Sequence, residues 1–404
     1  MNVLFLTIGQ IDSLKKSSVH IDVIKALRKK GHNVSVLCTI EKQFGDKTLV
    51  YEEDGVKIVR LKIGNITRCS IIEKGINTVL IESEFIKGLK KYFNDDKFDL
   101  VIYNTPPITF ANTVKYCKKK YHCKSYLMLK DIFPQNAVDI GILSKSGIKG
   151  LLYKMFRHKE HELYKVSDRI GCMSQGNVKY LLENNPEIDK TKVEIFPNSV
   201  YDYKKIEKSE DKSVLEKYGI DKNKLTFIYG GNLGKPQGLN FLVEGIKACR
   251  DLDCNFIIIG SGALKDEVFE NLKGVENAYT FDFLPQEEYI KFCSLADVGM
   301  LMLDYRFTIP NYPSRILSYM ENAMPVFACT DKVTDIKELV ESEAKCGRWC
   351  YSNNLEDFRK NVEWFVNNKD KLEELGNNGK KYLEEYFNAV KNVECLERMV
   401  GEDL

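Results

Sequence analysis

Short apolar runs alternate with amphipathic stretches along the first half of the chain. An apolar run at 3–6 precedes a polar loop, a stretch at 20–30 with apolar residues at helical spacing, and a stop at Gly31. A second apolar run at 34–37 completes a strand–helix–strand unit. Further strands are expected at 100–103, 125–129, 169–173 and 193–196. The alternation predicts a parallel sheet covered by helices on both faces.

The second half repeats this pattern after a polar, charged stretch at 203–212 that we expect to be a linker. Strands are expected at 225–229, 255–259, 278–281, 298–303 and 325–328, and the chain is mainly helical beyond Leu355. An amphipathic segment at 389–400 is expected to fold back on the first domain. We therefore predict an α/β protein with two Rossmann-like, doubly wound parallel-sheet domains, at 1–200 and 201–385, and a C-terminal helix within 386–404. Ligands of such sheets bind beyond the carboxyl ends of the strands, and the cleft between the domains is the first candidate.

Length and composition agree with two domains. The 404 residues exceed what one core usually serves, and an apolar content of 44% is normal for a globular protein. No export signal and no apolar run of membrane-spanning length is present, so the cytoplasm is the expected compartment. The twelve cysteines show no paired metal-site spacing, and we expect reduced thiols and no metal. The pair Cys346 and Cys350 is close enough to ligate or cross-link but lacks further ligands.

Charge is divided unequally between the two halves. Residues 1–198 carry 33 Lys and Arg against 22 Asp and Glu, and the remainder carries 27 against 36. A basic half suits nucleic acid, an anionic membrane surface or a phosphorylated substrate, but it also suits a solvated surface without a partner.

Two loops are candidates for binding phosphate. The loop after the first strand holds one glycine, so the G-x-G-x-x-G fingerprint of dinucleotide-binding enzymes is missing. The strand FIYGG, however, leads into NLGKPQG and then a helix from about Leu239, where glycines permit close backbone approach and Lys235 can neutralise phosphate. An ordinary strand–helix turn would explain the glycines equally well.

The segment NYPSRILSYMENAMPVFA is the second candidate. If Pro313 takes the first helical position, then Ser314, Arg315 and Ile316 present free backbone N–H groups, and Arg315 adds a fork of charged donors. Burial of the apolar side chains in the core would explain the helix without a ligand, and the two roles are compatible.

In these motifs the chain resembles retaining glycosyltransferases of the GT-B fold, family 4, in particular the bacterial capsule and O-antigen subgroup that includes N-acetyl-L-fucosamine transferases. The resemblance covers nearly the whole chain and rests on motifs in the family's order. They are KDIFPQNAVDIG (130–141), MSQGN (173–177), IFPNSVYD (195–202), YGGNLGKPQGL (229–239), IIIGSG (257–262), FLPQEEY (283–289), ADVGMLML (296–303) and YPSRILSYMENAMPV (312–326).

The resemblance implies that the second domain binds a nucleotide-sugar, with a UDP-sugar favoured and an N-acetylated hexosamine or deoxyhexosamine as candidate sugars. The implied donor-binding residues are Gly231, Asn232 and Lys235 at the diphosphate, Phe283 at the base, and Ser314, Arg315 and Ser318 at phosphate and sugar. The chain departs from the wider family where Pro310 and Ser318 replace two glutamates, and where Asn232 and Gln237 replace an arginine and a lysine. Lys235 and Arg315 would then carry the phosphate charge.

The first domain is expected to bind the acceptor. Asp131 follows a buried strand and is the candidate catalytic residue, able to hydrogen-bond an acceptor hydroxyl or take its proton, although a capping or loop-ordering role explains it too. Thr7, Gly9, His20 and Lys130 complete the predicted acceptor site, with a capping or structural role as the alternative for His20.

A membrane-surface role is expected for the stretch at 148–165, where apolar residues interleave with lysines and arginine. The apolar members are Leu151, Leu152, Met155 and Phe156, for which core packing is the default interpretation. By the family's habit the acceptor is a polyprenyl-diphosphate-linked saccharide, and the protein would lie on the cytoplasmic face of the inner membrane. No nucleic acid, cofactor or metal is expected.

Two alternatives stay open. A nucleotide-sugar 2-epimerase of the same fold would need paired acid and base residues, of which only Asp131 is apparent, and an inactive scaffold subunit would explain the absent glutamates. The donor sugar and base, the acceptor and linkage, and the oligomeric state do not follow from the sequence.

Overall fold

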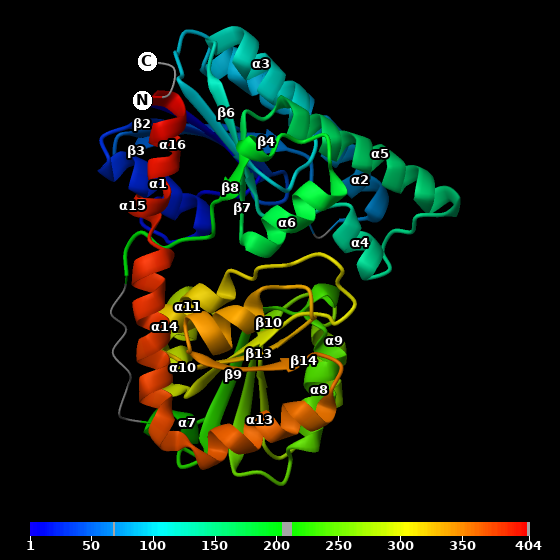
Figure 1. Cartoon of the computed structure of the whole chain (residues 1–404), viewed down its shortest axis with the longest axis vertical. Helices are drawn as coiled ribbons and strands as arrows, with labels where there is room; N and C mark the ends of the chain where they lie inside the picture. The colour runs from blue at the N-terminus through cyan, green and yellow to red at the C-terminus, as the bar shows by residue number, and fades with distance from the viewer. Residues whose placement is uncertain (68, 204–211, 402–404) are drawn as a thin grey trace. The chain divides into compact units, whose positions relative to one another are not determined.

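The structure is a computed structural model that describes residues 1–67, 69–203 and 212–401. The chain divides into two compact units, with Met1–Asp202 and Asn388–Leu404 in unit 1 and Tyr203–Phe387 in unit 2 (Figure 1). The sequence-based boundaries were 200 and 385. Most of the stretch expected to be a linker, 203–212, lies outside the described residues.

The described residues of unit 1 form an eight-stranded sheet in the order β3-β4-β2-β1-β5-β6-β7-β8. Neighbouring strands are parallel except β3 and β4. Burial on both faces explains why the central strands are continuous apolar runs. The strands are β1 (Asn2–Leu6), β2 (Asn33–Glu41), β3 (Leu49–Glu53), β4 (Val56–Ile63), β5 (Leu100–Asn104), β6 (Lys124–Leu129), β7 (Arg169–Cys172) and β8 (Val193–Ile195).

The antiparallel hairpin β3–β4 was missed by the sequence analysis. Its turn is Asp54-Gly55, with φ of 51° and 71°, which is the left-handed pair that a two-residue hairpin turn requires. The Asp-Gly dipeptide between two alternating segments is the signal that would have revealed it.

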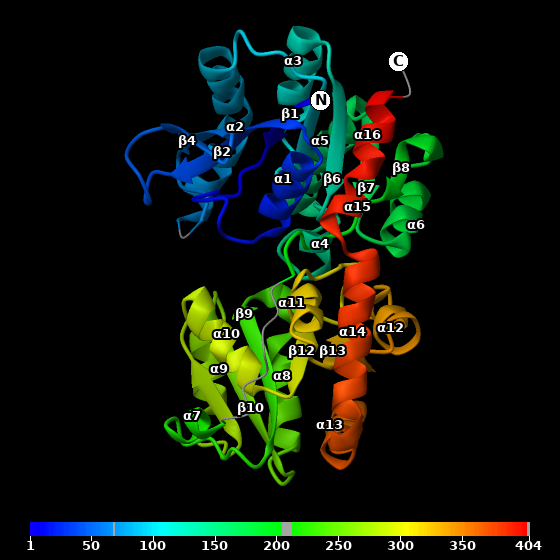
Figure 2. The ribbon, with the colours of Figure 1, turned by 90° about the vertical axis from the view of Figure 1, so that its left-hand side faces the viewer.

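Helices cover both faces of this sheet. On one face α1 packs with α15 and α16, because Phe5, Leu27 and Leu396 share one buried core. On the other face α2 packs against Leu37 and Leu61 at Gly88. Helix α3 lies between α2 and α5 and contacts both (Figure 2). The helices are α1 (Val19–Lys29), α2 (Ile71–Tyr92), α3 (Ala111–Tyr121), α4 (Gln135–Asp139), α5 (Gly147–Val166), α6 (Gln175–Asn184), η1 (Lys190–Lys192), α15 (Ala389–Asn392) and α16 (Glu394–Gly401).

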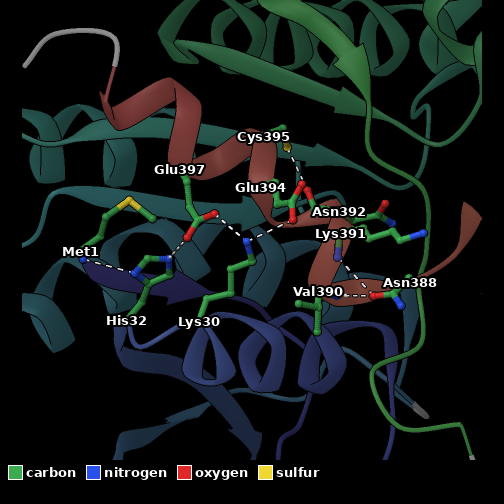
Figure 3. Close-up of polar contacts among 10 residues, drawn as sticks. All are labelled: Met1, Lys30, His32, Asn388, Val390, Lys391, Asn392, Glu394, Cys395 and Glu397. Carbon is green, nitrogen blue, oxygen red and sulfur yellow. Dashed lines mark hydrogen bonds and ion pairs between the residues drawn. The ribbon is translucent and has the colours of Figure 1, made fainter.

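The C-terminal segment belongs to unit 1, and polar contacts hold it there (Figure 3). The ammonium of Lys30 lies 3.2 Å from Glu394 and 3.0 Å from Glu397, and His32 Nε2 lies 3.0 Å from Glu397 Oε1. These pairs surround an apolar contact between α1 and the two C-terminal helices, which is the larger stabilising part of the interface.

The described residues of unit 2 form a parallel six-stranded sheet in the order β11-β10-β9-β12-β13-β14. The strands are β9 (Leu225–Asn232), β10 (Cys254–Ser261), β11 (Ala278–Phe281), β12 (Val298–Met302), β13 (Val326–Thr330) and β14 (Gly347–Tyr351). The helices are α7 (Ser213–Glu216), η2 (Lys235–Gln237), α8 (Leu239–Ala248), α9 (Lys265–Leu272), α10 (Gln286–Leu295), α11 (Arg315–Glu321), α12 (Ile336–Glu338), η3 (Leu339–Glu343), α13 (Leu355–Asn367), η4 (Lys369–Lys371) and α14 (Leu372–Tyr386). The predicted class, two doubly wound α/β domains, is confirmed.

Strand β14 was not predicted, because its sequence, GRWCY, attracted attention only through Cys346, which precedes it, and Cys350 within it. Both are buried free thiols, and Cys350 pairs in register with Cys329 on β13. Among the described helices, none is both long enough and apolar enough to cross a membrane.

Candidate functional site

The strand order of unit 2 places its candidate site at the carboxyl ends of β9 and β12. The chain winds from β9 outward through β10 and β11, and then crosses to β12 on the other side of β9. Such a reversal leaves a crevice between the two strands, beyond their carboxyl ends, where ligands of doubly wound sheets bind. Gly231 and Asn232 end β9, and Asp304 follows β12.

The glycines at the end of β9 are required by close approach of two side chains. A Cβ on Gly230 would lie 2.1 Å from the Tyr289 ring, and one on Gly231 would lie 1.9 Å from Arg315 Nη2. Gly231 also has a φ of 127°, which other residues rarely adopt. The glycine pair therefore admits Tyr289 and Arg315 to the strand end.

Arg315 is a cation with no anionic partner among the described residues. Its guanidinium stacks over the Tyr229 ring at 5.0 Å, and the part of the chain that the structure describes offers it no carboxylate partner. Burial acts to lower the pKa of Arg315, but Tyr319, Tyr229 and Tyr289 act to raise it, and the net direction is upward. The half-buried guanidinium thus stays charged, and an anionic ligand would compensate it.

The turn after β9 presents a second free cation. Lys235 is exposed and has no ion-pair partner among the described residues. The turn is held by the Asn232 side chain, which donates to Gln237 Oε1 at 3.2 Å, and by the Asp304 N–H, which donates to the Pro236 carbonyl at 2.9 Å.

Asp304 and Arg306 were missed by the sequence analysis. Arg306 donates to both carboxylate oxygens of the buried Asp304, each at 2.8 Å. This pairing neutralises Arg306, whereas Lys235 and Arg315 remain available to phosphate.

The expected start of helix α11 was wrong. The helix begins at Arg315 rather than Pro313, with Ser314 as an N-cap whose side chain makes no capping bond. The Ile316 N–H already donates to the Pro313 carbonyl at 3.4 Å, so it is not free. With seven residues the helix has a small dipole, so the positive charge comes from Arg315 rather than from the helix end. Ser318, half-buried, follows one turn after Arg315.

Phe283 lies in the loop between β11 and α10 with 70% of its surface exposed. No described contact brings it to the Arg315 cluster. The same segment reaches that cluster through Tyr289, whose hydroxyl is buried without a hydrogen-bond partner among the described residues. Tyr289 ends the motif FLPQEEY, but its contact with Gly230 became apparent only from the fold.

The corresponding reversal in unit 1 lies between β1 and β5 and gathers Thr7, Gly9 and His20. Thr7 Oγ1 accepts from the Gly9 N–H at 3.0 Å, and a Cβ on Gly9 would lie 3.2 Å from His20 Nδ1. Burial, followed by the charge of Lys130, lowers the pKa of His20 to about 4. The capping alternative for His20 is wrong, because Ser18 caps α1 by accepting from the Ile21 N–H.

Lys130 and Asp131 follow β6 and point to different neighbours. Lys130 Nζ donates to the Phe196 carbonyl at 3.1 Å, and burial lowers its pKa to about 7. Asp131 Oδ1 accepts from Asn136 Nδ2 at 2.6 Å. Burial raises the pKa of Asp131 to about 6 against this hydrogen bond, and the charge of Glu160 adds to the rise.

Thr105, after β5, fixes this loop and was not singled out from the sequence. Its hydroxyl accepts from the N–H groups of Lys130 and Asp131 at 3.0 and 3.1 Å and lies 3.0 Å from the Asp131 carbonyl. Asp131 does not cap α4, whose N-cap is Pro134, although ordering of the loop remains compatible with its contacts.

The chain is similar in sequence to known glycosyltransferases. Residues 210–382, nearly all of unit 2, match the family described as glycosyl transferases group 1. The chain is 24% identical over 268 residues to "Probable glycosyltransferase WbjE" of Pseudomonas aeruginosa, a match that covers 64% of each protein.

Solved structures share the fold over the whole chain. Sucrose-phosphate synthase from Thermosynechococcus elongatus superposes with a TM-score of 0.77 at 12% identity, and HepE of Anabaena in complex with UDP with 0.70 at 12%; each match covers 100% of both chains. The two-domain α/β architecture is therefore that of GT-B glycosyltransferases. Among the described residues no cluster of His, Cys, Asp or Glu has the makeup of a metal site, and the absence of a metal requirement stays a prediction.

Proposed function

We propose that this protein is a glycosyltransferase of polysaccharide biosynthesis that transfers a sugar from a nucleotide-sugar held by unit 2. The observation that carries the proposal is the uncompensated guanidinium of Arg315, packed on Gly231 where the sheet reverses. Lys235 adds a second free cation. A diphosphate matches this pair in charge, and HepE, which shares the fold, binds UDP and, in another structure, UDP-glucose.

The donor is proposed to be a UDP-sugar, with an N-acetylated hexosamine or a deoxyhexosamine as its sugar. Phe283 is exposed in the loop before α10 and is proposed to stack on the base. Ser314 and Ser318, on either side of Arg315, are proposed to contact phosphate and sugar. No metal enters this proposal, because the two cations supply the charge that the diphosphate needs.

In the proposed reaction the bond between the anomeric carbon and the diphosphate oxygen breaks, and the electron pair leaves with the diphosphate. Arg315 and Lys235 stabilise this growing negative charge. The acceptor hydroxyl forms the new bond to the anomeric carbon from the same face, so the stereochemistry is retained, and its proton passes to the departing diphosphate. Asp131 accepts the hydrogen bond of the hydroxyl when the acceptor binds, and the O–H turns to the diphosphate oxygen as the leaving group departs.

The acceptor is proposed to bind unit 1 at Thr7, Gly9, His20 and Lys130, and to be a saccharide on a polyprenyl diphosphate. Helix α5 supports a membrane surface, because Leu151, Leu152 and Met155 are exposed rather than part of the core. Only Phe156 of that group packs inward, at 5.0 Å from the Phe133 ring. Exposed lysines at 145, 149 and 154 accompany the apolar stripe, which is the pattern of a helix lying on anionic lipid.

One experiment separates this proposal from an epimerase and from an inactive scaffold. The full chain is incubated with UDP-, GDP- and dTDP-sugars, with and without a lipid-linked saccharide, and release of nucleoside diphosphate is followed. Release that depends on the acceptor supports transfer. Sugar isomerisation without release would favour the epimerase, and an absence of both turnover and donor binding would favour the scaffold.

A further inference from the structure

A cavity of about 230 Å³ lies in unit 1 where β2 and β4 end beside helix α2. Its apolar wall includes Ile63, Leu80 and Ile81, and Lys42 and Lys62 also line it. The wall is held in place at Gly64, where a Cβ would lie 2.3 Å from Asn77 Oδ1. Asn77 in turn donates to the Asn65 carbonyl at 2.8 Å, so loop and helix are locked together.

An exposed apolar stripe on α2 continues from this cavity. Ile76, Val79 and Leu80 are 57%, 65% and 48% exposed, and their spacing places them on one face of the helix. Leu80 belongs to both the stripe and the cavity wall. The opposite face of α2 supplies the core through buried Ile81 and Phe85, so packing within unit 1 does not account for the stripe.

Among the described residues, the two lysines that line the cavity have no ion-pair partner, whereas the acidic side chains around it are engaged. Lys42 is exposed and has no ion pair among the described residues, and Lys62 Nζ donates to the Asp46 carbonyl at 2.8 Å. The acidic member of the lining, Glu84, is paired with Lys87 at 2.8 Å. Glu41, next to Lys42, is engaged by the N–H groups of Ile66 and Thr67.

The cavity lies on the side of unit 1 that the acceptor would use. Strands β1, β2, β4, β5 and β6 run in one direction, so the residues that follow β2 and β4 share a sheet edge with Thr7 and Lys130. A partly open, mainly apolar pocket with two lysines in its lining differs in chemistry from the exposed stripe on α5. It complements a single amphiphile with an apolar chain and an anionic head.

We infer that the cavity and the α2 stripe bind the apolar chain of a long-chain lipid phosphate, with the phosphate at Lys42 and Lys62. This inference rests on the proposed function, since the lipid would be the carrier of the acceptor. The chain would cover Ile76, Val79 and Leu80, and the head group would lie toward the sheet edge.

Farnesyl monophosphate, used below its micelle concentration, is the probe, and its binding to the full chain is measured by equilibrium dialysis. Leu80→Glu is expected to weaken binding about tenfold or more, because it places a carboxylate in the apolar wall. Val79→Glu is the second variant, since Val79 is more exposed and the fold tolerates a charge there. Lys42→Glu is expected to weaken farnesyl phosphate but not farnesol, because only the phosphate faces the amine.

Val333→Glu in unit 2 is the matched control, as it makes the same change at an exposed apolar site outside unit 1, and it should leave the affinity within about twofold. Equal losses in Leu80→Glu and Val333→Glu would overturn the inference. So would an α2 variant that impairs sedimentation with phosphatidylglycerol vesicles while the protein shows no affinity for farnesyl phosphate, because α2 would then contact a bilayer.

Failure of the inference and failure of the proposed function give different results. If the protein transfers sugar to a lipid-free saccharide but does not bind farnesyl phosphate, the inference falls and the function stands. If farnesyl phosphate binds in a manner that requires Leu80 but no transfer occurs with any donor, the lipid-phosphate site stands and the function falls.

Discussion

The Arg315 guanidinium occupies the space that a side chain on Gly231 would need, with Nη2 only 1.9 Å from the position of such a Cβ. The relation joins the end of β9 to the start of α11, two segments that are far apart in sequence. A charged group is thereby held at the carboxyl edge of the sheet without a carboxylate partner among the described residues.

Gly231→Ala should therefore displace Arg315 as well as strain the backbone. We expect UDP affinity to fall at least about tenfold and the free energy of unfolding to fall by about 1–3 kcal/mol. Gly274→Ala is the matched control, because Gly274 also has a positive φ, 78°, but nothing lies within 4 Å of its added Cβ. Gly274→Ala should lose stability but keep its affinity for UDP. Calorimetric titration with UDP and thermal unfolding measure both effects, and equal UDP affinity in the two variants would contradict the steric argument.

Arg315→Ala tests the charge itself. Loss of a charge-assisted bond should weaken UDP binding by about 1.5–3 kcal/mol, and Arg315→Lys should recover part of the loss, since a lysine keeps the charge but not the fork of donors. Arg250→Ala, at an exposed site after α8, is the control and should bind UDP like the parent protein. Unchanged affinity in Arg315→Ala would remove the main support for the donor site.

The local sequence pattern was sufficient to predict the strands and the glycine turn after β9. It did not predict that Tyr289 and Arg315 pack against that turn. Strand β9 is a buried apolar run that is followed by two glycines and ends at Asn232, and these features are local. Tyr289 reaches Gly230 only because the chain crosses from β11 to β12 on the other side of β9, an order that no periodicity encodes.

The apolar residues of α5 also show what residue spacing cannot predict, namely which of them are buried. Phe156 and Leu151 carry the same helical signal, because apolar residues on two faces of one helix cannot be assigned to core or solvent by spacing alone. The helix that contains Arg315 was expected to begin two residues early, since Pro313 suits a first turn that the backbone does not adopt.

Asp131 should show opposite effects on stability and activity. Its pKa in the folded protein, about 6, lies above the ordinary 3.8, so ionisation opposes folding: the penalty is absent below pH 4, grows between pH 4 and 6, and is complete above pH 6. Asp131→Asn should stabilise the protein by about 1 kcal/mol at pH 8 and not at pH 3.5, while lowering transfer about tenfold or more.

Asp168→Asn is the control of opposite sign. Despite burial, hydrogen bonds from Lys118 and Ser125 lower the pKa of Asp168, so its charge stabilises the fold above pH 4 and this stabilisation is lost as the pH falls. The substitution should destabilise at pH 8. Urea unfolding at both pH values measures these changes in the free energy of unfolding. Destabilisation by Asp131→Asn at pH 8 would show that ionisation of Asp131 does not oppose folding.

The α5 stripe should bind anionic membranes through its exposed apolar residues. Leu151→Glu removes an apolar contact, with 68% of Leu151 exposed, and adds a charge that phosphatidylglycerol repels. We expect it to lower the partition coefficient on vesicles about tenfold, with a further loss in 0.5 M salt because the neighbouring lysines contribute electrostatically. Val333→Glu, at an exposed apolar site of unit 2, should leave vesicle binding unchanged. Vesicle sedimentation measures both variants, and equal binding by Leu151→Glu and the parent protein would mean that α5 does not face the lipid.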